Sequence, residues 1–415
     1  MNATLFKNVH VLDVRAGQLL EDHQVLVEGD AIRELSDRPI TATTARVIDG
    51  GGRTLMPGLI DCHVHVTFSQ TNLGLLAQTP QTTLALRALP ILRGMLRRGF
   101  TTVRDAGGAD WALKQAVDDG IDGTVTGPRL FVSGPALSPT GGHGDFRPRS
   151  DRLQPIGCGC QRLASTRVVD GVDAVRRAVR ELLQMGADQI KIMSSGGVAS
   201  PTDPVNALGY SLEETRAIVD EAAARHTYVL AHAYTPEAIR RAVECGVRSI
   251  EHGNLIDAPT AALMAERGAF AVPTLITYEA LARDGARLGL GAESVAKIEQ
   301  VRAAGLKSLE ILKTAGVRMA FGTDLLGASH DLQSEEFLIR AQVQSNLEVL
   351  QSATLIGAEL LNQVGVIGEI ASGARADLLL VDGNPLADLS CLTGQGERIP
   401  LVMQGGKLRV NELRA

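Results

Sequence analysis

Hydrophobic and polar positions follow two different patterns along the chain. Residues 1–55 and 365–415 contain short apolar or alternating runs separated by glycine-containing turns, among them LFKNVHVLDV and IPLVMQGGKLRV. Such runs are typical of β-strands. Between these ends one sequence pattern recurs. It consists of an amphipathic helix, a glycine, two or three residues and an apolar strand, as in AVRELLQMGADQIKIM and LEILKTAGVRMAFGTD. The glycine fits the left-handed position that ends a helix.

This pattern predicts eight strands that alternate with helices. The strands are expected at residues 55–63, 100–105, 129–133, 189–193, 228–232, 248–252, 271–275 and 319–323. This alternation favours an α/β fold of the (β/α)8 TIM-like barrel type, with a doubly wound open sheet as the alternative. Two helix starts are also legible. Ser211 and Glu214 form a capping box, and Thr235 precedes a proline at the first helical position.

Composition and charge exclude several classes of protein. With 45% hydrophobic and 21% charged residues among 415, the chain can build a packed core and is not disordered. A net charge of −6 offers no electrostatic attraction to nucleic acid or to an anionic membrane surface. The five cysteines form no C-x-x-C pair, which argues against a disulfide framework or a zinc ribbon. We find neither a signal peptide nor an apolar run of about 18 residues, so we expect a cytoplasmic protein.

Residue types that bind metals occur at the ends of five predicted strands: His63 and His65 in the first, Lys191 in the fourth, His232 in the fifth, His252 in the sixth and Asp324 after the eighth. All strands of a barrel end at the same mouth, so these residues can meet there. Histidines two positions apart point to one side of a strand and can hold one cation. The other two histidines can hold a second, and the aspartate can ligate a metal and accept a proton. A single strand histidine is usually a core residue, but so many desolvated polar groups together indicate a function.

Lys191 lies in an apolar run between two isoleucines, where a bare ammonium is costly to bury. Three interpretations are open: a lysine that snorkels to the barrel mouth, a Schiff-base lysine, and a lysine that CO2 has converted into a bridging carbamate. A Schiff-base enzyme has no need for four histidines beside it. The carbamate is therefore the favoured interpretation.

Five segments resemble strand signatures of the amidohydrolase superfamily: MPGLIDCHVHV, QIKIMSSGG, LAHAYTPEAI, SIEHGNLID and MAFGTDLLG. The resemblance extends over nearly the whole chain. TTVRDAGG and the TGGHGD loop make it similar to the branch that contains imidazolonepropionase-like proteins, binuclear Xaa-Pro or Xaa-Arg/Lys dipeptidases and a fungal ochratoxin-hydrolysing amidase. The resemblance implies a small β-sandwich domain of residues 1–55 and 365–415, and a catalytic barrel of residues 56–364.

The same resemblance implies two zinc ions bridged by hydroxide and by N6-carboxylated Lys191. His63, His65 and Asp324 would then hold the first zinc, and His232 and His252 the second. The hydroxide would attack an amide carbonyl, and Asp324 would pass its proton to the leaving nitrogen. Imidazolonepropionase is mononuclear and lacks this lysine, so Lys191 argues against that activity.

Substrate selection is expected in the loops after strands three, four, seven and eight, of which residues 134–170 form the longest. His143 in this loop resembles the family's substrate-contacting histidine. By the same resemblance Tyr234 would donate a hydrogen bond to the scissile carbonyl oxygen, although a rim aromatic that fills space is the plain alternative. The candidates for binding a substrate carboxylate are Arg104, Arg147, Arg149 and Arg152.

These observations predict a zinc-dependent amidohydrolase that releases the C-terminal amino acid from dipeptides or N-acyl amino acids, with proline or another uncharged residue as first choice. If Asp331, Glu335 and Glu336 line the pocket, arginine or lysine would be preferred instead. The alternative is a hydrolase or deaminase of cyclic amides or imidazolones, or an ochratoxin-type amidase. An inactive scaffold is disfavoured because all six ligands are kept. The resemblance also implies a homo-oligomer.

Overall fold

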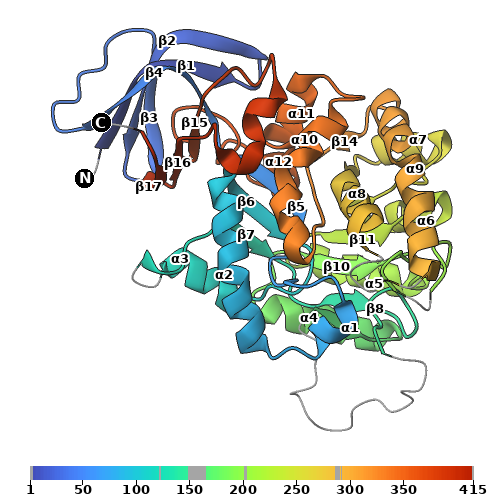
Figure 1. Cartoon of the computed structure of the whole chain (residues 1–415). Coiled ribbons are helices and arrows are strands. Elements are labelled where there is room, and N and C mark those ends of the chain that lie inside the picture. Colours follow the sequence, from blue (N-terminus) through green and yellow to red (C-terminus); the bar gives the residue numbers. More distant parts are fainter. Residues whose placement is uncertain are drawn as a thin grey trace.

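The computed structural model describes residues 3–120, 123–147, 165–200, 203–285, 290 and 292–413. Segments from both ends of the chain build one seven-stranded mixed sheet in the order β17-β16-β15-β4-β1-β2-β3. Its strands are β1 (Ala3–Asp13), β2 (Gln18–Glu28), β3 (Ala31–Ser36), β4 (Arg46–Pro57), β15 (Leu378–Val381), β16 (Leu401–Gln404) and β17 (Lys407–Asn411). Figure 1 shows this sheet at one side of the molecule, away from most of the helices.

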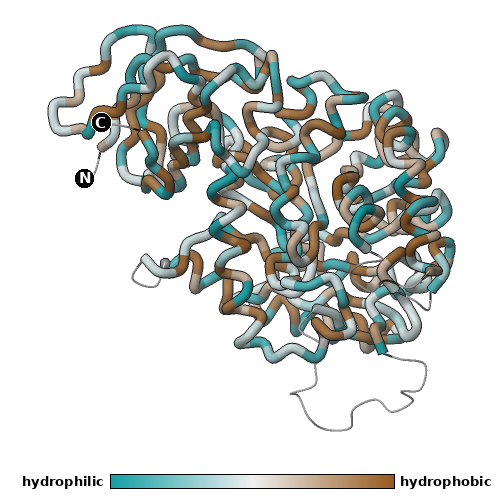
Figure 2. The backbone as a smooth tube through the Cα atoms, in the orientation of Figure 1, coloured by the Kyte–Doolittle hydropathy of each residue, from teal (hydrophilic) through white to brown (hydrophobic). Residues whose placement is uncertain are grey.

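One hydrophobic core joins the two ends of the chain within this domain. Phe6 and Val25 from the N-terminal strands are buried in the same cluster as Leu378 and Leu401 from the C-terminal strands. Apolar residues alternate with hydrophilic ones along these strands (Figure 2). The predicted small β-sandwich domain from both termini is therefore confirmed. Its bounds at residues 55 and 365 stay a prediction.

The strands of the barrel are β5 (Leu59–Val64), β6 (Phe100–Asp105), β7 (Arg129–Val132), β8 (Ala136–Ser138), β10 (Ile190–Met193), β11 (Val229–Ala233), β12 (Ser249–His252), β13 (Phe270–Val272) and β14 (Arg318–Met319). They pair in parallel as β5-β6-β7 and as β14-β13-β12-β11-β10-β8, with the short β9 (Thr166–Val168) beside β8. Backbone hydrogen bonds join these two sheets: Cys62 N–H donates to the Phe321 carbonyl (2.7 Å), and Asp188 N–H to the Val132 carbonyl (2.8 Å). The sheet is thus closed into the predicted (β/α)8 barrel, and the open-sheet alternative is wrong.

Helices surround the barrel: α1 (Leu73–Ala77), α2 (Gln81–Arg97), α3 (Trp111–Asp119), α4 (Val172–Gln184), α5 (Leu212–Ala223), α6 (Pro236–Glu244), α7 (Ala258–Glu266), α8 (Leu275–Asp284), α9 (Ala292–Thr314), α10 (Glu336–Arg340), α11 (Asn346–Ser352) and α12 (Leu355–Leu360). The predicted capping box of Ser211 with Glu214 begins α5, and Thr235 caps α6. Gly186, Gly246, Gly268 and Gly316 end the recurring helices, and all four have positive φ. These caps and glycines determine where the helices begin and end between the strands. With the helices placed in this way, the C-terminal ends of the parallel strands meet at one mouth of the barrel.

The barrel strands differ from the predicted ones at three places. Residues 55–57 extend β4 of the small domain, because they pair with β15, so the first barrel strand begins at Leu59. The third predicted strand, 129–133, coincides with β7 alone, and the short β8 that follows it lies outside the predicted range. The eighth is short as a regular strand, but Phe321 and Asp324 continue it by backbone bonds to Cys62 and His63. None of these differences moves a predicted ligand away from the mouth.

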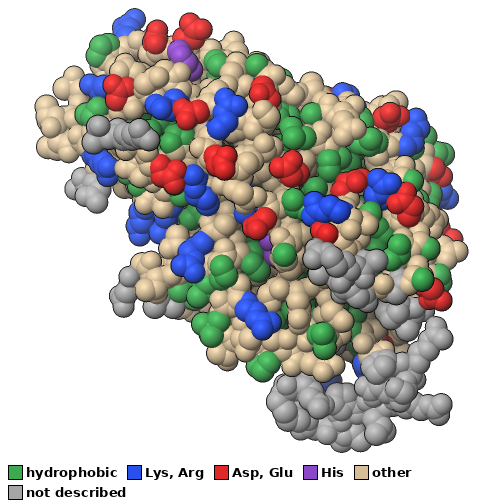
Figure 3. Space-filling model, viewed as in Figure 1, with side chains coloured by type: hydrophobic (Ala, Val, Ile, Leu, Met, Phe, Trp, Pro, Cys, Tyr) green, Lys and Arg blue, Asp and Glu red, His purple; other side chains and the backbone are tan. Residues whose placement is uncertain are grey.

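Charged side chains of both signs are interspersed on the face of the molecule in Figure 3. This mixture agrees with the small net charge of the chain. Among the described helices, none combines the length and the apolar character that crossing a membrane requires.

Candidate metal centre

Three of the predicted ligands form a compact group at the barrel mouth. Asp324 Oδ1 lies 3.4 Å from His63 Nε2 and 3.1 Å from His65 Nε2. The ligand atoms of the three residues all lie within 4.8 Å of one another. Burial alone would raise the pKa of Asp324, but the two histidines hold it well below its usual range. An ionised carboxylate beside two imidazoles is a donor set that suits zinc and related divalent cations.

The second predicted pair lies directly beside this group. The rings of His232 and His252 have centroids 4.7 Å apart, and those of His63 and His252 are 5.0 Å apart. Burial, reinforced by neighbouring cationic groups, keeps the pKa of His232 and of His252 well below the ordinary value. Neutral imidazole is the form that binds metals, so this environment favours ligation.

Lys191 on β10 lines the same pocket as the four histidines and is 2% exposed. Burial lowers the pKa of its amine to about 8. Among the residues that the structure describes, none forms a hydrogen bond or an ion pair with its Nζ. A buried amine without such a partner among the described residues, in one pocket with four imidazoles and a carboxylate, fits a bridging position between two metal ions.

Two of the ligands are held in strained backbone conformations. His252 has φ 71° and Asp324 has φ 53°, which is the left-handed region that non-glycine residues rarely adopt. Each such residue costs about 1–3 kcal/mol, and strain of this kind concentrates at functional sites. Asp324 keeps its conformation because its N–H donates to the His63 carbonyl at 2.8 Å. The bond ties the end of the eighth strand to the end of the first, where the ligands meet.

A buried salt bridge supports His63 from inside the barrel. Glu251 Oε2 lies 2.6 Å from His63 Nδ1, and Arg104 Nη2 lies 2.9 Å from both oxygens of Glu251. Burial alone would raise the pKa of Glu251, but Arg104 and His63 hold it far below its usual range. An acceptor on Nδ1 fixes the tautomer of the ring and leaves Nε2 for the metal. Arg104 is 0% exposed and does not line the pocket, so it is not available to bind a substrate carboxylate.

Two further predicted ligands are oriented in the same way, whereas His232 is held through Nε2, which lies 3.1 Å from the Gly196 carbonyl. His65 Nδ1 lies 2.8 Å from the Gly107 carbonyl, and His252 Nδ1 lies 2.8 Å from Thr274 Oγ1. The sequence analysis missed Glu251 and Thr274. Glu251 could have been found, because it is an acidic residue directly before His252 in a predicted barrel strand.

His143 and Tyr234, the two predicted substrate contacts, lie at the same pocket. The ring of His143 stacks on that of His232, with centroids 4.4 Å apart and planes 19° apart. Gly197 makes this possible, because a Cβ there would lie 2.1 Å from the His143 ring. Tyr234 OH lies 2.9 Å from Tyr278 OH. Burial raises the pKa of Tyr234, so its hydroxyl stays protonated and can donate a hydrogen bond.

The rest of the described lining is mostly apolar: Phe68, Leu73, Phe146, Met193, Val198, Leu281 and Leu326. The three acidic residues that would favour arginine or lysine substrates are not part of it. Glu336 is fully buried and bound to Arg340 at 2.9 Å, whereas the Asp331 side chain is 77% exposed. Arg147 forms an ion pair with Asp145 at 2.6 Å. The other candidate arginines, Arg149 and Arg152, lie outside the described residues.

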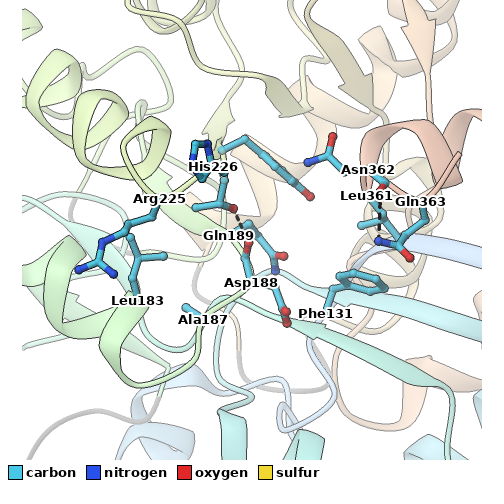
Figure 4. Close-up of a pocket in the computed structure, with 12 residues that line it drawn as sticks. Phe131, Leu183, Ala187, Asp188, Gln189, Arg225, His226, Leu361, Asn362 and Gln363 are labelled. Atoms are coloured by element: carbon cyan, nitrogen blue, oxygen red, sulfur yellow. Dashed lines mark hydrogen bonds between the residues drawn. The ribbon is translucent and has the colours of Figure 1, made fainter.

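A second cavity, of about 430 Å³, opens at the opposite end of the barrel (Figure 4). Its lining includes Asp188 and Gln189, which precede β10, and His226, which precedes β11. It is larger than the pocket at the mouth, which measures about 70 Å³. None of the predicted ligands lines it, and the N-terminal ends of barrel strands serve stability rather than catalysis. The positions of the predicted metal ligands therefore favour the smaller pocket as the candidate site.

The chain belongs to the amidohydrolase family, whose model matches residues 54–408. Members of this family are generally binuclear metal enzymes. The chain is accordingly a hydrolase that acts on amide or peptide C–N bonds of small molecules.

Three known proteins illustrate the similarity. A crystal structure of an amidohydrolase is 60% identical, with a TM-score of 0.97 and complete coverage of both chains. A prolidase solved in complex with N-methylphosphonate-L-proline is 57% identical, with a TM-score of 0.96, over 99% of this chain and 100% of that one. Ochratoxinase from Aspergillus niger is 33% identical over 366 residues, which are 85% of this chain and 75% of the relative.

Proposed function

We propose that the protein is a binuclear zinc dipeptidase that releases the C-terminal amino acid from dipeptides or N-acyl amino acids, with Xaa-Pro as the preferred class. The observation that carries the proposal is that Lys191, buried and unpaired among the described residues, lines the same largely apolar pocket as the two predicted pairs of histidines. The 57% identical relative, a prolidase solved with a proline phosphonate, supports the choice of proline.

In this proposal His63, His65 and Asp324 would hold one zinc ion, His232 and His252 would hold the other, and carboxylated Lys191 would serve as a ligand to both. Zinc, when bound, supplies Lewis acidity and lowers the pKa of a water molecule. Asp324 takes up a proton from the attacking water on a carboxylate oxygen and delivers it to the leaving nitrogen.

His143 and Tyr234 supply hydrogen bonds to substrate oxygens, Tyr234 to the scissile carbonyl, because both line the pocket beside the metal ligands. The apolar walls contact the side chain of the released residue and exclude water. A charged side chain would be desolvated against them without a partner among the described residues, which is costly. Proline or another uncharged residue therefore suits this pocket better than arginine or lysine.

A second candidate is an amidase for larger N-acyl amino acids of the ochratoxin type, or a hydrolase of cyclic amides. The specific support is the 33% identity to the Aspergillus niger ochratoxinase over most of both chains. The metal ligands would be shared, and the difference would lie in the loops at the mouth.

The test is amino-acid release from protein produced with zinc and bicarbonate, using Ala-Pro, Ala-Phe and Ala-Arg in parallel. We expect rapid release from Ala-Pro, slower release from Ala-Phe, and the slowest from Ala-Arg. Absence of release from all three, with two metal ions per chain confirmed, would reject the dipeptidase proposal. N-acyl amino acids and lactams would then be tested as substrates. Assembly as a homo-oligomer and location in the cytoplasm stay predictions.

A further inference from the structure

A buried carboxylate stands behind His143 and is not one of the metal ligands. Asp203 Oδ2 lies 3.3 Å from His143 Nδ1 and accepts the Gly197 N–H at 2.8 Å. Asp203 is only 3% exposed. Burial works to raise its pKa, but the hydrogen bond from His143 keeps the pKa below its usual value. Asp203 is therefore an ionised acceptor that faces one nitrogen of the His143 ring.

The backbone that carries Asp203 is anchored by a lysine from a distant helix. Lys297 on α9 donates hydrogen bonds to the carbonyls of Gly197 (2.9 Å), Ser200 (2.6 Å) and Asp203 (2.9 Å). An ammonium has three hydrogens, so these three bonds use its full donor capacity. Lys297 thereby ties the loop after β10 to the outer layer of helices.

These contacts leave the His143 ring little freedom. Stacking on His232 fixes the plane of the ring, and Gly197 packs against its edge at a distance that no other residue type would allow. Asp203 then determines which edge of the His143 ring faces the loop after β10, because it binds Nδ1 of that ring. Only Nε2 remains for a group in the pocket.

We propose that Asp203 and Lys297 are positioning residues for catalysis: Asp203 sets the orientation of His143, and Lys297 holds Asp203 in place, so that Nε2 meets a substrate oxygen. This proposal rests on the function proposed above, in which His143 contacts the substrate. It adds two residues, 94 positions apart, that are not part of the described pocket lining.

The test is a double-mutant cycle. Asp203→Asn, His143→Ala and the combined variant are compared by kcat and KM on the best substrate of the wild type. We expect Asp203→Asn to lower kcat/KM by about tenfold or more, as loss of an orienting partner does for other histidines. In the His143→Ala background the same change should cost nothing further, because the only route of its effect is gone. Additive losses would overturn the proposal and indicate a general structural role.

Lys297→Met tests the second part of the proposal, that Lys297 holds Asp203 in place. Lys307→Met is the matched control on the same helix. Lys307 is exposed and pairs only with Glu310, three residues away. We expect Lys297→Met to reproduce the kinetic loss of Asp203→Asn with two metal ions per chain retained, and Lys307→Met to leave kcat/KM unchanged. Equal kinetics for the two variants would contradict the role of Lys297.

Crystal structures of the wild type and of Asp203→Asn give a readout that does not depend on the substrate. A turned or disordered His143 ring in the variant supports the positioning role, and an unchanged ring rejects it. If the wild type cleaves no dipeptide, the proposed function fails, whereas this structural comparison still decides whether Asp203 orients His143.

Discussion

Both ends of the barrel contain a cavity lined in part by polar residues, but the chemistry of these residues differs. At the opposite end, Asp188 is neutralised by Lys114 at 2.6 Å and accepts the Val132 N–H at 2.8 Å. At the mouth, Lys191 is buried and has no such partner among the described residues, and the Asp324 carboxylate lines the same pocket. Asp188, the one acidic residue in the described lining of the opposite cavity, is already neutralised, whereas the mouth gathers residue types that can bind metal ions.

If cavity volume alone were the criterion, the candidate site would be placed at the opposite end of the barrel from the predicted ligands. The larger cavity, of about 430 Å³, lies where strands begin, and its acidic residue already has partners. The mouth pocket is smaller but brings together five histidines, Lys191 and Asp324. A functional site is better recognised by the convergence of metal-binding and titratable side chains than by volume.

The largest expected effect is that of Lys191→Ala. Loss of the bridging ligand should remove the second metal ion and lower kcat/KM by roughly 10³-fold or more, which corresponds to the several kcal/mol that metal ions contribute to charge stabilisation. The measurements are metal content per chain and dipeptide hydrolysis. Lys114→Met at the other end is the control and should keep both metals and activity. Full activity of Lys191→Ala would contradict the proposal that the mouth, and not the opposite end of the barrel, is the functional site.

Glu251→Gln tests the support beneath His63. A neutral amide cannot stabilise the ring as the carboxylate does, so we expect about 10- to 100-fold weaker zinc binding or lower activity. The variant also leaves Arg104 without its buried counter-charge, which we expect to lower the free energy of unfolding by about 3–5 kcal/mol. Zinc titration and thermal unfolding separate the two effects. Unchanged zinc affinity would show that His63 needs no orienting carboxylate.

The lowered pKa of Lys191 predicts how reconstitution depends on pH. Only the neutral amine reacts with CO2, and burial brings its pKa down to about 8. The neutral fraction therefore rises as pH increases and grows by about fivefold between pH 7 and pH 8 for a pKa of that value. The rate at which metal-free protein regains activity with zinc at constant dissolved CO2 should rise likewise and level off above pH 9. A rate that keeps rising tenfold per pH unit up to pH 10 would indicate an ordinary lysine.

The smallest effect is expected for Asp188→Asn at the opposite end. The change removes a partly exposed ion pair with Lys114, which is worth about 1 kcal/mol or less. The amide can still accept the Val132 N–H. We expect a slight decrease in the free energy of unfolding, measured by denaturant titration, and unchanged kcat/KM. A large loss of activity would show that the two ends of the barrel are functionally coupled.

Local sequence signals predicted most of the fold but not all of its boundaries. The four glycines after helices and the caps at Ser211 and Thr235 are short-range features, so they could be identified correctly. Residues 55–57 were assigned to the barrel because they continue an apolar run into β5. Their pairing with β15, more than 300 residues later in the chain, could not be seen in that run.

The amino-acid sequence by itself determined the barrel and the candidate ligands. The alternation of strands and helices brings the strand ends to one mouth, and the residues at those ends are encoded locally. Only the tertiary structure decided which polar groups support them. Glu251 meets His63 across 188 residues, and Lys297 binds Gly197 across 100. The physical reason is that burial makes each polar group depend on a specific partner, and the partner is chosen by packing in space rather than by neighbours in the chain.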